Sequence, residues 1–554
     1  MMMNRMLPIL FLAFAGALSL NAQQITYTNP VIPGFNPDPS ICRVGEDYYL
    51  ATSSFEYFPG VPIYHSKDLV HWQMIGHALD RPSQLNLDGV KCSAGIYAPT
   101  LRYQNGTFFM TTTLTGDAGN FIVTATHAAG PWSEPHWIED APGIDPSLFF
   151  DDDGKIYFCG TKGAERQLWP THNNIWVQQL DTVQWKLVGP KIEVIDGSAF
   201  YKSNTHMDGG LETGMNNFEA PHLYKKEGRY YIILAHGGTG HNHAVSIWAS
   251  DQVFGPYNSC PQNPILTHRD LSANFPITAT GHGDLIQTQQ GEWWMVLLAK
   301  RLQDGSNPLG RETFLAPVDW NGLWPVVNPS GYIGRLEQIM PAPALPQTPL
   351  PGFPGRDEFD TGRLRPEWTF IRTPRSRWWS LNEVPGSLRI ALRPERISDQ
   401  AQPAFIGLRQ QHFNFTVTTE MRFTPSNEHE EAGLVVERDN NHYFKFAVTG
   451  SGEKPRIVLA QKEAGKEEQL LLTEQPAQAA HYLRVACNNN LYIFSYSADG
   501  KEWIVQTKET DGRFLGTPRA GRFTGTFIGM YASSNGQPSS NHADFDWFEY
   551  SPMH

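Results

Sequence analysis

Three acidic residues stand at corresponding places in a pattern that repeats along the first part of the chain. Asp38 lies between two prolines in GFNPDPSI, Asp145 precedes a proline in IDPSLFF, and Glu219 precedes Ala-Pro in EAPHLYK. Three carboxyl groups that share a cleft repel one another, so at least one should have a raised pKa. A carboxylate and a protonated carboxyl group together can act as general base and general acid. On opposite faces of a sugar, such a pair supports water-assisted cleavage of a glycosidic bond.

The alternative interpretation of Asp38 and Asp145 is that an aspartate beside proline only caps a turn, which is a common role. Repetition argues against it. The pattern of a residue before proline, an apolar run, a turn and two aromatic residues occurs five times. The copies read GFNPDPSI with GEDYYLATSS, YAPTLRYQNGTFFM, IDPSLFFDDDGKIYF, EAPHLYKKEGRYYI and GHGDLIQTQQGEWWMV. The position before the proline, which Gly283 replaces in the last copy, holds Asp38, Ala98, Asp145, Ala220 and His282.

The five copies predict an all-β fold whose first domain, residues 25–340, is a five-bladed β-propeller. In a propeller the innermost strands line a central channel, so residues at their starts converge on one mouth of it. Residues 341–355, PAPALPQTPLPGFPG, are predicted to be a semi-rigid linker. Residues 356–554 alternate apolar and polar side chains, as in HYLRVACNNNLYIFSYSADG, which predicts a C-terminal β-sandwich.

Composition and the N-terminus indicate the partner and the compartment. The formal net charge of −13 argues against nucleic acid or an anionic membrane surface as partner, and a neutral polysaccharide fits better. Residues 1–22 are predicted to be a signal peptide, with Arg5 before a short apolar run and Ala22 at the cleavage site. The protein is therefore expected to be exported, to the periplasm or the medium, without membrane insertion. The five cysteines form no CxxC pair, and although they could form one disulfide, they are predicted to be small buried hydrophobes.

The motifs GFNPDPSI, GIDPSLFFDDDG, FEAPHLYK and LGRETF together resemble glycoside hydrolase family 43, in particular its two-domain branch of β-xylosidases and α-L-arabinofuranosidases. The resemblance implies an inverting, single-displacement mechanism that requires no cofactor. It matches Asp38 to the general base, Glu219 to the general acid, and Asp145 to the carboxylate that raises the acid's pKa and orients it. Arg311, in PLGRETF, matches an arginine that hydrogen-bonds the terminal pentose.

The resemblance also matches aromatic residues to the pocket, although packing explains each of them equally well. Phe55 matches a phenylalanine that stacks on substrate. Tyr97 stands where xylosidases of the family often have tryptophan, which tilts the expectation toward arabinofuranosyl substrates. Phe527, in GRFTGTFIGM, is expected to be a lid residue contributed by the sandwich.

Histidines raise the question of a metal. His282 is expected to hydrogen-bond the pocket carboxylates or, alternatively, to ligate a structural metal or water cluster on the propeller axis. His236, His241 and His243, in AHGGTGHNHAV, lack a cysteine partner or HExxH spacing. They are therefore predicted to belong to a polar, glycine-rich loop near the cleft, and no zinc site is predicted.

The sequence predicts an exo-acting, inverting glycosidase that releases a terminal pentose from hemicellulose-derived oligosaccharides, with α-L-arabinofuranose ahead of β-D-xylose. Three alternatives stay open. An endo-acting arabinanase or xylanase would need an open groove, and a carbohydrate-binding propeller would bind sugar without hydrolysis. A retaining sucrose- or fructan-active propeller fits less well, because its carboxylate motif has a different local sequence.

Overall fold

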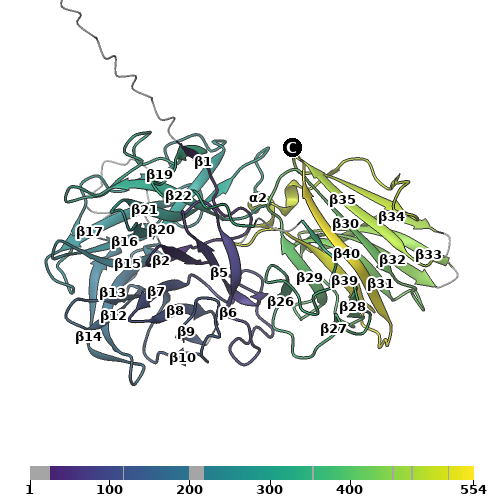
Figure 1. Cartoon of the computed structure of the whole chain (residues 1–554), viewed down its shortest axis with the longest axis horizontal. Coiled ribbons are helices and arrows are strands. Elements are labelled where there is room, and N and C mark those ends of the chain that lie inside the picture. Colours follow the sequence, from purple (N-terminus) through teal and green to yellow (C-terminus); the bar gives the residue numbers. More distant parts are fainter. Residues whose placement is uncertain are drawn as a thin grey trace, which may run out of the picture.

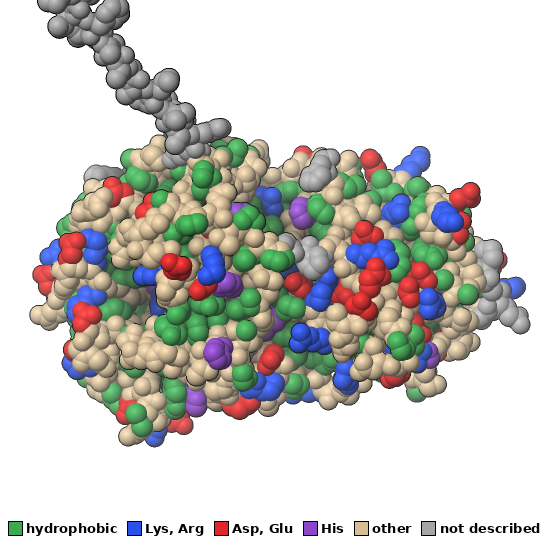
Figure 2. All heavy atoms as spheres, viewed as in Figure 1, with side chains coloured by type: hydrophobic (Ala, Val, Ile, Leu, Met, Phe, Trp, Pro, Cys, Tyr) green, Lys and Arg blue, Asp and Glu red, His purple; other side chains and the backbone are tan. Residues whose placement is uncertain are grey.

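The computed structural model describes residues 25–116, 118–198, 217–351, 355–451, 454–475, 478–521 and 523–553. Two β-rich domains lie side by side (Figure 1). The predicted signal peptide, residues 1–22, lies outside the described residues. No helix in the described ranges is long and apolar enough to cross a membrane. Acidic and basic side chains are interspersed over both domains on the face shown in Figure 2.

The first domain consists of five separate antiparallel sheets, which confirms the predicted five-bladed propeller. Blade I contains β2 (Ser40–Val44), β3 (Asp47–Ala51), β5 (Gly60–Ser66) and β6 (Gln73–Leu79). Blade II contains β7 (Thr100–Gln104), β8 (Thr107–Leu114), β9 (Gly119–Ala125) and β10 (His136–Trp137). Blade III contains β11 (Ile144–Phe150), β12 (Ile156–Gly163), β13 (Asn173–Asp181) and β14 (Lys186–Asp196).

Blade IV has one short extra strand. It contains β15 (Glu219–Lys226), β16 (Arg229–His236), β17 (Ala244–Ser250), β18 (Asn258–Ser259) and β19 (Leu266–Thr267). Blade V contains β20 (Ile277–Gln287), β21 (Trp293–Arg301), β22 (Glu312–Asp319) and β23 (Val326–Val327). Each blade begins with one of the five repeated segments. These first strands form the inner ring, in which β2 contacts β7 and β20, and β11 contacts β7 and β15.

Two features close the ring of blades. β1 (Thr26–Thr28) pairs antiparallel with β24 (Ile339–Pro341), so the two ends of the propeller segment are joined by a ladder. Near the axis, Asp284 of blade V accepts hydrogen bonds from Ser40 Oγ at 2.7 Å, the Ile41 amide at 3.0 Å and Arg102 Nη1 at 2.8 Å. The Tyr224 hydroxyl also donates to Asp284. Asp284 thereby links blades I, II, IV and V in a fully buried position.

The second domain is a sandwich of two antiparallel sheets, as predicted. One sheet contains β25 (Arg356–Asp357), β27 (Trp379–Ser380), β28 (Leu388–Ala391), β30 (Phe415–Arg422), β35 (His481–Asn488), β36 (Leu491–Ser497), β37 (Ile504–Val505), β38 (Thr510–Asp511) and β40 (His542–Pro552). The other contains β26 (Thr369–Ile371), β29 (Ala404–Arg409), β31 (Glu431–Asp439), β32 (His442–Ser451), β33 (Lys454–Glu463), β34 (Lys466–Glu474) and β39 (Phe527–Ser533). A 3-10 turn, η2 (Arg513–Leu515), and the short helix α2 (Thr517–Ala520) precede β39.

Side-chain alternation explains the sandwich. In β35 every second residue is buried, because one face of a strand covers the core and the other meets solvent. β34, KEEQLLLTE, lies at the edge of its sheet and is mostly exposed. Its charged residues suit an unpaired edge, since charge discourages pairing with another chain.

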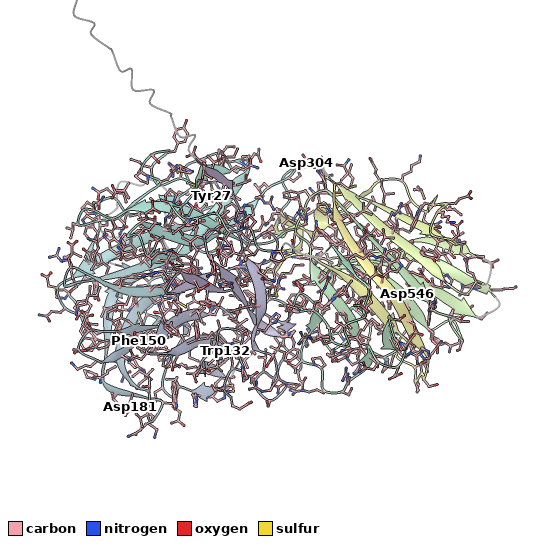
Figure 3. All side chains as sticks on the ribbon, viewed as in Figure 1. Tyr27, Trp132, Phe150, Asp181, Asp304 and Asp546 are labelled. Carbon is pink, nitrogen blue, oxygen red and sulfur yellow. The ribbon has the colours of Figure 1, made fainter. Side chains whose placement is uncertain are left out.

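The two domains are joined by more than the linker. β4 (Tyr57–Phe58) comes from the propeller segment yet pairs with β26, which makes it the last strand of a sandwich sheet. The loop that contains Asp304, which Figure 3 labels near the junction, also bonds the sandwich. There Asn490 Nδ2 donates to the Gln303 carbonyl at 2.9 Å, and Ser306 Oγ donates to the Arg513 carbonyl at 3.0 Å. The linker packs on the propeller, where the Thr348 amide donates to Asp68.

Candidate active site

A cavity of about 150 Å³ lies where the starts of the five inner strands converge. All five blades and the sandwich contribute to its wall. The lining residues are Asp38, Phe55, Tyr97, Ala98, Ile144, Asp145, Glu219, Thr239, His282, Arg311 and Phe523. Asp38, Asp145 and Glu219, which are far apart in the sequence, therefore share one pocket, as the repeat phase predicted.

Irregular backbone at the strand starts carries these side chains. Asp38, Asp145, Ala220 and His282 all have positive φ, between 51° and 56°. This conformation is uncommon for residues other than glycine, and such strain concentrates at functional sites. The strand register shifts beside three of the four, between Ile144 and Ser147, between Glu219 and His222, and between Gly281 and Asp284. A bulge of this kind changes the direction of the side chains at the end of a strand.

In blades III and IV a proline explains why pairing lapses at these positions, because proline cannot donate a hydrogen bond to the ladder. In blade IV the residue with positive φ is Ala220, directly before Pro221. Glu219 comes one residue earlier, at the first position of β15, and still faces the cavity. The one-residue offset of Glu219 in the sequence is thus preserved in the structure.

Asp38 is held in its ionised form. Its Oδ1 accepts a hydrogen bond from Arg311 Nη1 at 2.7 Å and lies 3.3 Å from His282 Nδ1. Its Oδ2 accepts from Ser53 Oγ at 2.5 Å. Burial alone would raise the pKa of Asp38, but the Arg311 charge and the bonds from His282 and Ser53 outweigh burial and hold that pKa well below its usual range.

Glu219 and Asp145 are shifted in the opposite direction. Burial, followed by the charges of Asp145 and Asp38, raises the pKa of Glu219 well above its ordinary value. Burial also raises the pKa of Asp145 to about 6, against the charges of His282 and Arg311 and the Ala220 amide hydrogen bond. The pocket therefore combines an ionised carboxylate with a carboxyl group that keeps its proton near neutral pH.

Arg311 also fixes the aromatic wall. Its guanidinium lies 5.2 Å from the ring centre of Phe55 and 5.5 Å from that of Phe523, and its Nε donates to the Phe523 carbonyl at 3.2 Å. Tyr97 packs 5.2 Å from Phe55, ring centre to ring centre. The predicted Phe55 and Tyr97 thus line the pocket, with Arg311 between the propeller and the sandwich.

The structure places a different lid residue from the one the sequence predicted. Phe527 is fully buried and stacks on Tyr57 with ring centres 3.9 Å apart, and it is not among the residues that line the cavity. Phe523, four residues earlier, lines the cavity and is 39% exposed. Phe527 opens strand β39, so packing within the sandwich sets its direction, whereas Phe523 lies in the loop before that strand.

Sequence reasoning also missed Ser53, Ala98, Ile144 and Thr239. Ser53 carries no motif signal beyond its place after an apolar strand. Ala98 was identified at the repeat phase but was not chosen as a site residue. Thr239 belongs to the glycine-rich loop that was predicted to lie near the cleft, and Lys300 Nζ holds this loop through a hydrogen bond to the Thr239 carbonyl at 2.8 Å.

Two histidines near the pocket contact other groups of the protein. Within the described ranges, no group of three or more His, Cys, Asp or Glu side chains is placed to hold a metal ion. His282 Nδ1 faces Asp38, and His243 Nδ1 lies 3.1 Å from the Ala279 carbonyl. Of the five cysteines, those at positions 42, 159, 260 and 487 are free and buried, as expected for small hydrophobes. Cys92 departs from the prediction, because it is only partly buried and its Sγ donates to Asn440 Oδ1 at 3.3 Å.

Comparisons with known proteins agree with this architecture. Residues 27–325 match the model of glycosyl hydrolases family 43, and residues 356–551 match that of the beta xylosidase C-terminal concanavalin A-like domain. The chain is 41% identical over 527 residues to a xylosidase/arabinosidase of Butyrivibrio fibrisolvens, covering 94% of this chain and 98% of that relative. It is 40% identical over 556 residues to a non-reducing end alpha-L-arabinofuranosidase of Bacteroides ovatus, covering 99% of each.

A solved structure has the same two-domain architecture. The crystal structure of a xylan beta-1,4-xylosidase from Bacillus halodurans superposes with a TM-score of 0.86 at 34% identity, covering 95% of this chain and all of that one. The propeller, its carboxyl-lined pocket and these matches define a glycoside hydrolase. The chain belongs to glycosyl hydrolases family 43.

Proposed function

We propose that this enzyme is an exo-acting, inverting glycosidase that releases a terminal pentose from hemicellulose-derived oligosaccharides. The observation that carries the proposal is the opposite shift of the pKa values of Asp38 and Glu219 inside one small pocket. A general base must be ionised and a general acid must hold its proton at the same pH, and this pair meets both conditions.

In the proposed reaction Asp38 removes a proton from a water molecule, and the water oxygen attacks the anomeric carbon. Glu219 donates its proton to the leaving glycosidic oxygen as the bond to the anomeric carbon breaks. The Asp38 carboxylate gains one proton, Glu219 loses one, and the product has the opposite anomeric configuration. Asp145 keeps the pKa of Glu219 high, and Arg311 both holds Asp38 and lies in position to bond the sugar.

The size of the pocket supports exo action. A cavity of about 150 Å³ has the volume of roughly five water molecules at about 30 Å³ each, which is room for one small sugar ring. Phe523 of the sandwich covers part of its rim. An endo-acting enzyme needs a groove that holds several sugars on both sides of the cleaved bond.

Tyr97 supports α-L-arabinofuranose as the preferred sugar, with β-D-xylose second. Its ring forms part of the wall, and its hydroxyl donates to the Ser93 carbonyl at 3.3 Å, so that the ring is held in place. The names of the relatives favour both sugars, since one is an arabinofuranosidase and another a xylosidase. The order of arabinofuranose before xylose therefore rests on Tyr97, which stands where xylosidases of the family often have tryptophan.

The test is product analysis on arabinoxylan, xyloglucan, arabinan and xylo-oligosaccharides. We expect a free pentose as the first product, arabinose ahead of xylose, and proton NMR should show the inverted anomer at early times. Retention at the anomeric carbon would rule out the mechanism. Mixed oligosaccharides as first products would favour the endo alternative, and binding without hydrolysis at any pH would favour a carbohydrate-binding propeller.

The proposed location is the periplasm or the medium, after removal of residues 1–22. Arg5 and the apolar run that follows it support this. Amino-terminal sequencing of protein from the native host should give a start close to residue 23, and a start at Met1 would exclude export by this route.

A further inference from the structure

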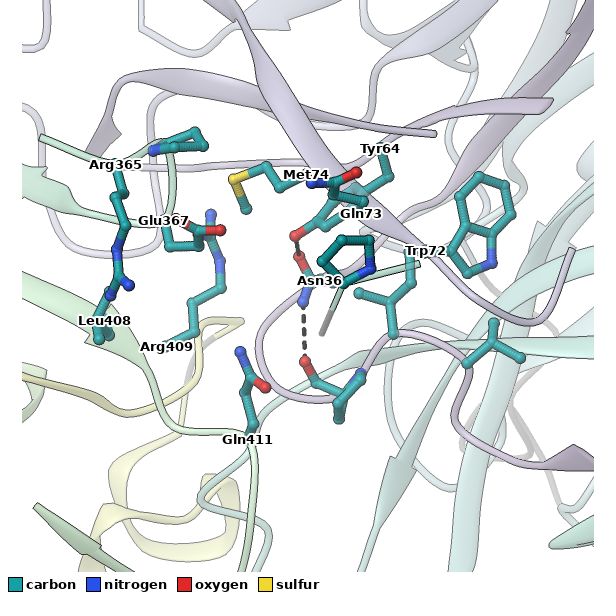
Figure 4. A pocket seen from close by; sticks show the side chains of 15 residues that line it. Asn36, Tyr64, Trp72, Gln73, Met74, Arg365, Glu367, Leu408, Arg409 and Gln411 are labelled. Carbon is teal, nitrogen blue, oxygen red and sulfur yellow. Dashed lines mark hydrogen bonds between the residues drawn. The ribbon is translucent and has the colours of Figure 1, made fainter. Parts of the chain in front are cut away.

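A second cavity, of about 400 Å³, lies at the junction of the propeller and the sandwich (Figure 4). Among the described residues it shares no lining residue with the catalytic pocket. Its volume is within the range of about 300–1,000 Å³ that is typical of small-molecule sites. The residues that line it are Val31, Ile32, Pro33, Asn36, Tyr64, Trp72, Gln73, Met74, Pro351, Arg365, Pro366, Glu367, Leu408, Arg409 and Gln411.

Two charged side chains of the sandwich, Arg409 and Glu367, line this cavity, and each has a buried polar atom with no hydrogen-bond partner in the described part of the chain. Arg409 is 5% exposed and donates through Nε to the Phe35 carbonyl at 2.8 Å, but its Nη2 has no acceptor. Glu367 Oε2 has no donor. Buried polar atoms are nearly always paired, so groups left unpaired around a cavity indicate an occupant that completes them.

The opposite wall, from the propeller, is already ordered. The Tyr64 hydroxyl donates to Asn36 Oδ1 at 2.6 Å, and Asn36 Nδ2 donates to the Pro33 carbonyl at 3.0 Å. The Trp72 indole N–H donates to the Leu69 carbonyl at 2.8 Å, which fixes the ring. A preformed wall with an aromatic ring, together with two charged side chains of the other domain, is the arrangement typical of a small-molecule site.

The charges at the cavity determine the class of ligand. Arg365 is paired with Asp357 at 2.9 Å, which leaves one cation, Arg409, and one anion, Glu367. An anionic ligand would repel Glu367 and a cationic one would repel Arg409. A guanidinium only donates and a carboxylate only accepts, whereas a hydroxyl group does both. A neutral ligand with neighbouring hydroxyl groups satisfies both residues at once.

We propose that the junction cavity is a second carbohydrate site, which binds a neutral mono- or disaccharide with Arg409 and Glu367 on its hydroxyl groups and Trp72 beside its apolar face. The bound sugar contacts both domains. Its wall includes Asn36, which is two residues from Asp38, the proposed catalytic base.

The experiment is calorimetric titration of the full chain with D-xylose and with L-arabinose. Arg311→Ala, in the catalytic pocket, weakens binding there, so the event that persists in this variant belongs to the junction. We expect Gln73→Trp, at the exposed rim of the cavity, to weaken that event at least tenfold while hydrolysis continues at the wild-type rate. Gln469→Trp, on the exposed edge strand β34, is the matched control and should leave binding unchanged.

Arg409→Met should weaken the junction event in the same way, with Arg484→Met on the other sheet as its control. If Arg409→Met does not fold, Gln73→Trp decides the question alone. The proposal is overturned if no binding event survives Arg311→Ala, or if Gln73→Trp leaves the surviving event unchanged. A crystal soaked in either pentose that shows only water in the cavity also overturns it. Hydrolysis assays on the same proteins test the proposed function separately.

Discussion

The guanidinium group of Arg311 lies unevenly among three carboxyl groups and contributes to the opposite shifts of their pKa values. Arg311 touches Asp38 at 2.7 Å, so its charge lowers the pKa of that carboxyl most strongly. Arg311 lowers the pKa of Glu219 by less than burial and the charges of Asp145 and Asp38 raise it. Position relative to this cation therefore contributes to the opposite pKa shifts of Asp38 and Glu219, the proposed base and acid.

Replacing Glu219 tests its proposed role as the general acid. Glu219→Ala should lower kcat/KM by about 10²–10⁴-fold on natural oligosaccharides, because their leaving groups need a proton. The loss should be far smaller on nitrophenyl glycosides, whose leaving groups need little protonation. Glu227→Ala, at the exposed hairpin turn of the same blade, is the matched control. An equal loss on both kinds of substrate would show that Glu219 is not the acid.

Asp145→Asn should move the alkaline limb of the pH–rate profile toward lower pH. The Asp145 charge raises the pKa of Glu219, so an uncharged asparagine lets Glu219 lose its proton at a lower pH. The expected result is a narrower pH optimum with the acid limb, set by Asp38, nearly unchanged. Asp153→Asn, on an exposed hairpin turn, should leave both limbs in place. A shift of the alkaline limb to higher pH would contradict the assignment of Asp145.

Sequence reasoning brought the three carboxyl groups together because each has a fixed place in a repeated hairpin. Residues at the same position of the repeat lie at the same position of their blades. Glu219, one residue earlier in its repeat, also lies in the pocket. Sequence reasoning named Phe527 instead of Phe523 as the lid residue, because both lie in one segment of a domain that has no such repeat. The choice depends on where strand β39 begins, and boundaries of strands are set by tertiary packing.

At the scale of elements, the repeated hairpins were predictable and strand β4 was not. Tyr57 and Phe58 lie between two strands of blade I, where local pattern favours a loop, yet Tyr57 pairs with Ile371 and Phe58 with Phe370. Nothing in the local sequence encodes a partner more than three hundred residues away. The consequence is that a sandwich sheet ends inside the propeller segment.

Beside β4 lies a buried cluster of like charges. Glu437 of β31 accepts a hydrogen bond from the Tyr57 hydroxyl at 3.0 Å, and Glu56 accepts one from the Ser93 amide at 3.0 Å. Burial, followed by the charges of Glu56 and Asp439, raises the pKa of Glu437 to about 8. Burial likewise raises the pKa of Glu56 to about 7. Both residues are 2% exposed or less, so this contact between the domains favours protonated carboxyl groups.

Glu437→Gln should therefore stabilise the protein at alkaline pH. The ordinary pKa of glutamate is 4.5, so between that pH and about 8 the folded state binds more protons than the unfolded state. Its stability falls as pH rises through this window. The variant should melt several degrees above wild type at pH 8 and close to it at pH 4.5. Glu468→Gln on exposed β34 is the control, and an equal effect at both pH values would contradict the mechanism.

At the scale of the whole molecule, the sandwich forms part of the catalytic pocket. The sandwich supplies the Phe523 ring, and the Phe523 carbonyl accepts from Arg311 Nε. The Phe523 amide in turn donates to Ser93 Oγ of the propeller at 3.1 Å. Arg311, whose charge lowers the pKa of Asp38, is thus bonded to both domains.

Separating the domains should abolish most of the activity. A chain of residues 25–340 leaves β4 without its partner and Arg311 without the Phe523 carbonyl, so we expect kcat/KM to fall far below that of the full enzyme.

Because the isolated propeller can also lose activity by misfolding, the variant Phe523→Ala in the full protein tests the contribution of this pocket residue alone. We expect that variant to raise KM with a smaller change in kcat, since the ring contacts bound sugar without taking part in proton transfer. Phe275→Ala is the matched control, because Phe275 is 37% exposed against 39% for Phe523 and lies outside the pocket. If Phe523→Ala and Phe275→Ala behave alike, and the isolated propeller keeps full activity, then the sandwich has no part in the pocket.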